Sequence, residues 1–138
     1  MTDAELLAEI KSAWAHWSEH LGLQNWWVYF QHKPKQDAFM SVATNHTEYH
    51  RVGFYWRQPK PSELKPLPWP ISRYVLHEAL HVPLERTADV AYKYMGNAGF
   101  KEYRDHAEVV CDEMTAIIFR LHEACHVPDM GMTEGPCT

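Results

Sequence analysis

A proline-rich segment divides this chain into two parts in which different regular structures are expected. Five of its nine prolines fall between Gln58 and Pro70, in the segment QPKPSELKPLPWP. Proline lacks the amide hydrogen that a helix interior or a central strand requires, so an extended loop is expected here. Such a segment is most often a surface connection, and a rim beside a functional site is the alternative. The regular structure is therefore expected before and after this loop.

The part before the loop predicts one helix and three strands. Apolar side chains recur at helical spacing from Asp3 to His20, and Thr2 and Glu5 have the spacing of a capping box. Three runs then alternate between apolar and polar residues, at about 25–32, 38–44 and 51–56. Three short strands close in sequence favour a small antiparallel sheet.

The part after the loop predicts helices at about 72–81, 84–95 and 101–125, with glycines at Gly96 and Gly99 ending the second. At 138 residues the chain suits one domain, expected over 1–128. Residues 129–138, which contain two glycines and a proline, are expected to form a flexible tail. Together these elements predict an α+β fold.

The first helix after the loop carries His77-Glu78-Ala79-Leu80-His81, which has the spacing H-E-x-x-H. Residues four apart lie on one helix face about a turn from each other, so both imidazoles can bind one zinc ion. The glutamate can then reach a water bound to the metal. We interpret His77 and His81 as zinc ligands and Glu78 as a general base. Ordinary helix residues are the alternative interpretation.

A catalytic zinc site usually has three protein ligands, and the last predicted helix offers the third. Glu108 is the leading candidate. Asp112, one turn further on, could accept a hydrogen bond from His77 and raise its basicity. His106 is the alternative third ligand.

This set of residues resembles the gluzincins, the thermolysin-like zinc peptidases with H-E-x-x-H and a Glu-x-x-x-Asp on a following helix. The resemblance rests on His77, Glu78, His81, Glu108 and Asp112. The order of elements is also similar to a minimal zincin domain, as in small metallopeptidases that phages and bacteria carry. The SprT-like peptidases are a neighbouring possibility that would use His106, although the glycine-rich context expected there is absent.

The resemblance implies hydrolysis of peptide bonds in a protein or peptide by a zinc-activated water, with Glu78 as general base. It also implies an oxyanion donor, for which the sequence offers Tyr92, Tyr94 and Tyr103 without distinguishing them. The third strand could hold an extended peptide at a sheet edge. Two other classes fit the same scaffold: a non-catalytic zinc-binding structural or interaction module, and a metal-independent helical interaction protein.

An almost identical octapeptide lies near the C-terminus. Residues 76–83 read LHEALHVP, and residues 121–128 read LHEACHVP. Only twelve residues follow His126, so no later helix can supply a third ligand. We interpret His122 and His126 as residues of a solvated helix end. A second or adventitious metal site is the alternative.

Charge and composition narrow the classes of partner. The net charge is -5 and no basic cluster is present, which disfavours nucleic-acid binding. No apolar run approaches membrane-spanning length and no secretory signal is expected, so we expect a cytoplasmic protein without a membrane partner. The three cysteines do not suggest a disulfide framework, and Cys111 and Cys125 are expected to be buried. Cleavage preference and oligomeric state stay open.

Overall fold

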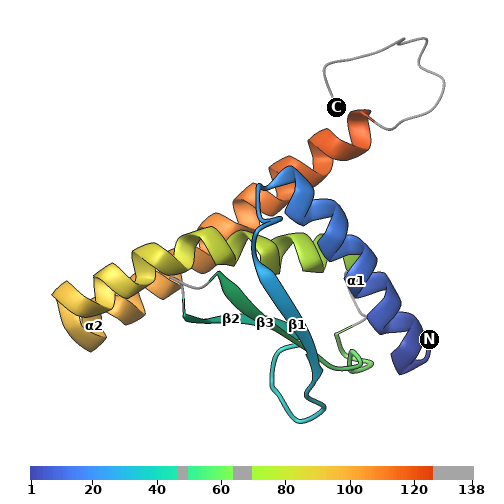
Figure 1. Ribbon diagram of the computed structural model, residues 1–138, viewed down its shortest axis with the longest axis horizontal. Helices are drawn as coiled ribbons and strands as arrows, with labels where there is room; N and C mark the ends of the chain where they lie inside the picture. The colour runs from blue at the N-terminus through green and yellow to red at the C-terminus, as the bar shows by residue number, and fades with distance from the viewer. Residues whose placement is uncertain (47–49, 64–69, 126–138) are drawn as a thin grey trace.

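The computed structural model describes residues 1–46, 50–63 and 70–125, which form an α+β arrangement (Figure 1). The elements follow in the order α1 (Asp3–His20), β1 (Trp27–His32), β2 (Met40–His46), β3 (Arg51–Trp56) and α2 (Ile71–Cys125). The bounds predicted for the first helix and the third strand are confirmed. Residues 64–69 of the proline-rich loop and the expected tail at 129–138 lie outside the described residues.

Helix α1 begins at the predicted capping box. The Thr2 backbone amide donates to the Glu5 carboxylate at 2.7 Å, and the Glu5 amide donates to the Thr2 hydroxyl at 3.2 Å. The apolar face of the helix is buried in the core. On that face the Trp17 indole Nε1 donates to the Ser72 carbonyl at 2.9 Å. This bond ties α1 to the start of α2.

The sheet is mixed, so the prediction of an antiparallel sheet was wrong. Its strand order is β1-β3-β2, with β1 parallel to β3 and β2 antiparallel to β3. The central position suits β3, because its side chains at Val52, Phe54 and Trp56 are all buried in the core. Since β3 is paired on both sides, the expectation that this strand offers an edge to a peptide was also wrong.

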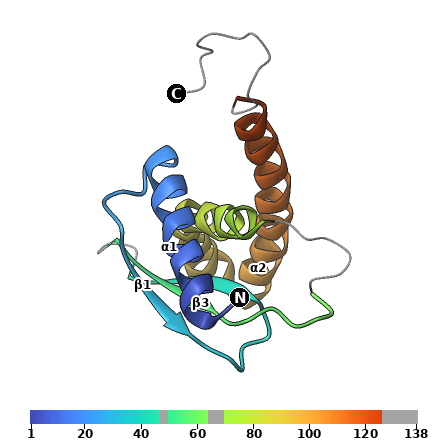
Figure 2. The same cartoon turned by 90° about the vertical axis from the view of Figure 1, so that its right-hand side faces the viewer.

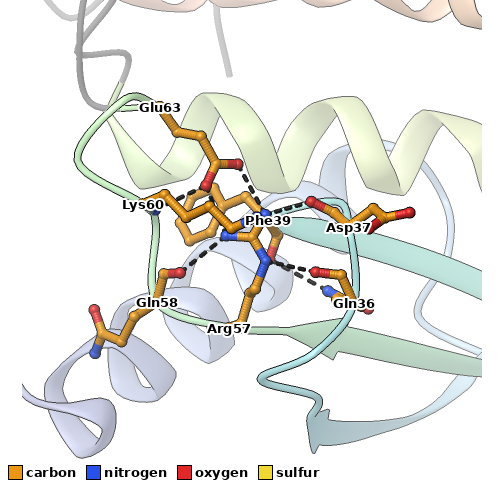
Figure 3. A network of polar contacts seen from close by, with 7 residues as sticks. All are labelled: Gln36, Asp37, Phe39, Arg57, Gln58, Lys60 and Glu63. Carbon is orange, nitrogen blue, oxygen red and sulfur yellow. Dashed lines mark hydrogen bonds and ion pairs between the residues drawn. The ribbon is translucent and has the colours of Figure 1, made fainter.

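Arg57, directly after β3, anchors the connection between β1 and β2. Its guanidinium is only 3% exposed; Nε donates to the Gln36 carbonyl at 2.8 Å and a terminal nitrogen donates to the Asp37 carbonyl (Figure 3). The Arg57 amide donates to the Phe39 carbonyl at 3.1 Å. Glu63 completes the network by accepting from both terminal nitrogens, at 2.7 and 3.0 Å. The β1–β2 connection is therefore held at the end of β3.

Helix α2 continues through Pro83, so the predicted break between 81 and 84 was wrong. Its one non-helical residue is Gly96, with φ 71° and ψ -166°, a left-handed backbone conformation that costs glycine little. The chain reverses there into a first arm (71–95) and a second arm (97–125). The Tyr103 hydroxyl donates to the Leu84 carbonyl at 2.8 Å, so the arms lie side by side (Figure 1).

The first arm is the centre of the packing. In Figure 2 it lies between α1 and the second arm, with the sheet below. Its inward face, Val75, Leu76, Ala79, Leu80 and Val82, is buried in the same core cluster as α1 and the sheet. Although α2 is long, no helix among the described residues combines the length and apolar character needed to cross a membrane.

The two cysteines of the second arm differ in environment. Cys111 is buried as expected, and burial raises the pKa of its thiol to about 12. Cys125 is exposed, so the expectation that it is buried was wrong.

Candidate metal centre

Three of the predicted ligands converge where the two arms of α2 face each other. His77 and His81 lie one turn apart on the first arm, and their Nε2 atoms are 3.2 Å apart. Glu108 on the second arm places one carboxylate oxygen 3.3 Å from His77 Nε2 and the other 3.0 Å from His81 Nε2. The reversal at Gly96 is what brings Glu108 to the histidines.

The spacing of these atoms fits a zinc ion. Ligand atoms that lie 2.0–2.1 Å from zinc in tetrahedral geometry are about 3.3 Å from one another. The two imidazole nitrogens, 3.2 Å apart, are close to that value, and each carboxylate oxygen of Glu108 lies at a similar distance, 3.3 or 3.0 Å, from one of them. Across the described ranges, His77, His81 and Glu108 are the one group of three such side chains whose ligand atoms come within 4.8 Å of one another.

Asp112 orients the first histidine. Its carboxylate lies 3.0 Å from His77 Nδ1, and only the imidazole can supply the hydrogen between them. Nδ1 therefore carries a hydrogen, and in the neutral ring Nε2 has the lone pair on the side of His81 and Glu108. Asp112 and Glu108 have side chains 62% and 58% exposed, so this side of the site is open to solvent.

The second histidine is prepared for coordination by its surroundings. Burial lowers the pKa of His81, against the opposing effect of the nearby Glu108 carboxylate. A lowered pKa favours the neutral imidazole, which is the form that binds a metal. His81 therefore needs little deprotonation to act as a ligand at neutral pH.

Glu78 lies in the same cleft but is not among the converging atoms. The cleft has a volume of about 280 Å³ and is lined by Phe39, Met40, Tyr74, His77, Glu78, Glu108 and Asp112. Burial, followed by the negative charge of Glu108, raises the pKa of Glu78 to about 8, and a hydrogen bond from the Val42 backbone partly opposes this. Without a cation nearby, Glu78 is expected to be protonated at neutral pH.

This raised pKa predicts how the stability of the metal-free protein depends on pH. The pKa of the Glu78 carboxyl rises from 4.5 to about 8 on folding, so the folded protein binds a proton that the unfolded chain releases in this pH interval. The free energy of unfolding therefore decreases as pH increases from about 4.5 to 8. Glu78→Gln removes the titration, so the metal-free variant should be more stable than wild type near pH 9, by a few kcal/mol, and similar to it near pH 5. Urea unfolding in chelator at both pH values measures the difference.

The exposed Glu113 on the second arm provides the matched control for this experiment. Glu113→Gln removes the same charge and should change stability by the same small amount at both pH values. A stabilisation by Glu78→Gln that is equal at the two pH values would contradict the prediction, because titration of Glu78 could not then be its cause.

The other candidates for this site lie away from it. His106, the alternative third ligand, has a side chain 78% exposed and lies 4.0 Å from Glu102. It is two residues from Glu108, about 200° around the helix, and does not join the converging group. Tyr92 and Tyr94 are exposed, and the Tyr103 hydroxyl is engaged with a backbone carbonyl.

Sequence reasoning missed the tyrosine that does line the cleft. Tyr74 precedes His77 by three residues and packs edge-to-face on Phe39, with ring centroids 5.4 Å apart. The i, i+3 spacing from His77 was the available signal, because side chains three apart share a helix face. Phe39 and Met40 had no comparable signal, since they reach the cleft from the sheet.

The second copy of the motif is in a different environment. His122 is half-buried, with its Nε2 2.9 Å from His16 Nε2 on α1. Glu123 is exposed, and His126 lies outside the described residues. His122 therefore belongs to a contact between helices, which the interpretation as a solvated helix end did not include.

Comparisons of the chain with protein-family models, curated proteins and solved structures found no match. The chemistry of the site is therefore the basis for assigning a function. It combines two imidazole nitrogens and a carboxylate, which converge, with a cleft lined by the half-buried Glu78.

Proposed function

We propose that this protein is a zinc-dependent metallopeptidase that hydrolyses peptide bonds in a protein or peptide substrate. One observation carries the proposal: His77, His81 and Glu108 converge as a possible set of metal ligands, and Glu78 lines a cleft together with His77 and Glu108. A structural zinc site closes its fourth position with protein, whereas a catalytic one leaves it open. Three converging ligands beside a cleft of about 280 Å³ favour the catalytic kind.

His77, His81 and Glu108 would hold the ion, and Asp112 would keep His77 in the required tautomer. When bound, zinc supplies a Lewis acid that polarises a carbonyl and makes water more acidic. Glu78 takes the proton of the attacking water and later gives it to the leaving amine. Burial favours its neutral form and a nearby cation favours its ionised form, so both steps are accessible near neutral pH.

The surroundings of the cleft suit an extended peptide. Among the described strands, β2 pairs with β3 alone, so its other side is a sheet edge, and Met40 at its start lines the cleft. A substrate strand can bind such an edge through main-chain hydrogen bonds. The Tyr74 hydroxyl is our candidate for stabilising the oxyanion, because Tyr74 lines the same cleft as Glu78.

The test is whether the protein cleaves a substrate only when zinc is bound at this site. Zinc-loaded protein should cleave a denatured protein substrate, a chelator should abolish cleavage, and added zinc should restore it. His77→Ala should weaken zinc binding by at least about 100-fold and remove activity, because it deletes a ligand. Zinc content after dialysis and the cleavage rate are measured on the same samples.

His106→Ala is the matched control, since it removes an exposed histidine of the second arm. It should keep both zinc and activity. If His106→Ala loses zinc while Glu108→Gln keeps it, the third ligand has been assigned wrongly. If folded, zinc-loaded wild type cleaves no denatured substrate, the site belongs to a non-catalytic zinc-binding module.

A further inference from the structure

A second group of histidines lies where α1 contacts the second arm of α2. We call His16, His20 and His122 the interhelical histidine cluster. His16 and His122 direct their Nε2 atoms at each other across 2.9 Å, with rings nearly perpendicular at 85°. The His20 ring centroid lies 4.5 Å from that of His16 and 6.2 Å from that of His122.

The facing nitrogens limit where hydrogen atoms can lie. Two N–H groups cannot point at each other across 2.9 Å, so at least one Nε2 presents a lone pair. Either one ring donates a hydrogen bond to the other, or both lone pairs face a shared cation. The proposed zinc ligands His77 and His81 show almost the same geometry, with Nε2 atoms 3.2 Å apart.

His20 has the hydrogen-bond arrangement that is typical of metal-binding histidines. Its Nδ1 lies 2.9 Å from the His16 backbone carbonyl, which can only accept, so Nδ1 carries the hydrogen. In the neutral ring Nε2 then has the lone pair. The side chain of His20 is exposed, so its ring can turn toward the pair formed by His16 and His122 by giving up the hydrogen bond to the His16 carbonyl.

The cluster is reachable from solvent and has an apolar side. The Trp17 ring lies 5.0 Å from that of His122, which shields the pair on one side. A groove of about 450 Å³ is lined by His16 and His122 together with Glu9, Ser12 and Ser72. A hydrated cation can enter through this groove, and the carboxylate of Glu9 favours its approach.

We propose that His16 and His122 form a second transition-metal site, with His20 as third ligand after rotation. Imidazole ligands select zinc, copper or nickel over calcium or magnesium. The sequence motif pointed to His126 as the partner of His122, whereas the structure pairs His122 with a helix 106 residues away. A metal here would link α1 to the end of α2, a role separate from the proposed peptidase chemistry.

The test is a zinc titration of the untagged full chain by calorimetry. Wild type should bind one equivalent tightly, at the His77 site, and a second more weakly, because fewer preformed ligands hold it. His16→Gln and His122→Gln should each lose only the weaker equivalent, and His77→Ala only the tighter one. Combining His77→Ala with His122→Gln should remove both. His32→Gln, on β1, is the control and should keep both.

Thermal unfolding gives a second readout. In the His77→Ala background, excess zinc should raise Tm, because the metal binds the folded helix pair and not the unfolded chain. Adding His122→Gln should remove that rise. If His16→Gln does not fold, the exposed His20→Gln replaces it and should weaken the second equivalent by about tenfold.

The possible results separate the two proposals. If wild type binds a single equivalent that His77→Ala removes, the second site is wrong, and the cluster is a hydrogen-bonded histidine pair. If the single equivalent is lost in His122→Gln and kept in His77→Ala, the second site stands and the proposed catalytic centre is wrong. If His16→Gln and His122→Gln both retain two equivalents, the second site is overturned.

Discussion

Replacing Glu78 with glutamine should leave zinc bound and lower peptide hydrolysis by about 10³-fold. Glutamine has nearly the same shape but cannot accept a proton from water or return one to the leaving amine. Zinc should stay because Glu78 is not among the three converging ligands. Steady-state kcat/KM on an unstructured peptide, together with zinc content after dialysis, measures both parts of this expectation.

Glu113→Gln is again the matched control, since it removes an exposed carboxylate from the second arm. It should keep wild-type kcat/KM and zinc content. A Glu78→Gln variant as active as wild type would show that cleavage arises elsewhere, including from a contaminating protease. Loss of zinc in Glu78→Gln would instead make Glu78 a ligand and require a different general base.

Replacing Arg57 with leucine should destabilise the protein by about 3–5 kcal/mol. The buried guanidinium serves the carbonyls of Gln36, Asp37 and Gln58 as well as the Glu63 carboxylate, and leucine satisfies none of them (Figure 3). The hydrogen bond from Arg57 also lowers the pKa of Glu63, so the charged pair is the favoured state. Urea unfolding followed by circular dichroism at neutral pH measures the loss.

Glu63→Gln separates the ion pair from the rest of this network. It should cost about 1–2 kcal/mol, because Arg57 keeps its carbonyl acceptors and an amide oxygen replaces the carboxylate. Equal losses in the two variants would mean that the carbonyl contacts contribute nothing. In that case Arg57 could not explain why the β1–β2 connection crosses the end of β3.

The parts of the fold that the sequence predicted well are those with local causes. The capping box at Thr2 and Glu5 sets the start of α1, and alternation along 51–56 sets β3. The proposed metal ligands could be predicted from the sequence for a similar reason. His77 and His81 are related by one helical turn, and Glu108 needed only a chain reversal, which Gly96 supplies.

The remaining features depend on contacts between residues distant in sequence. The β1–β2 connection is held by Arg57, whose acceptors at Gln36 and Asp37 precede it by about twenty residues. Pro83 did not end its helix, although proline in a helix interior costs about 3 kcal/mol. Its neighbours Leu80 and Val82 are buried, and burying each side chain is worth about 1.5–3 kcal/mol, which offsets that cost.

Because the chain reverses at Gly96, the affinity of the proposed site for a metal would depend on how often the two arms of α2 come together, as well as on the ligands themselves. Two proposed ligands lie on one arm of α2 and the third on the other, so the effective concentration of the Glu108 carboxylate at the histidines is set by how often the hairpin is closed. A Cβ atom at position 96 would meet no atom within 4 Å beyond its chain neighbours, so the effect of Gly96→Ala would come from the left-handed backbone. A metal ion bound at the proposed site would be thermodynamically linked to the hairpin: each would stabilise the other by the same free energy.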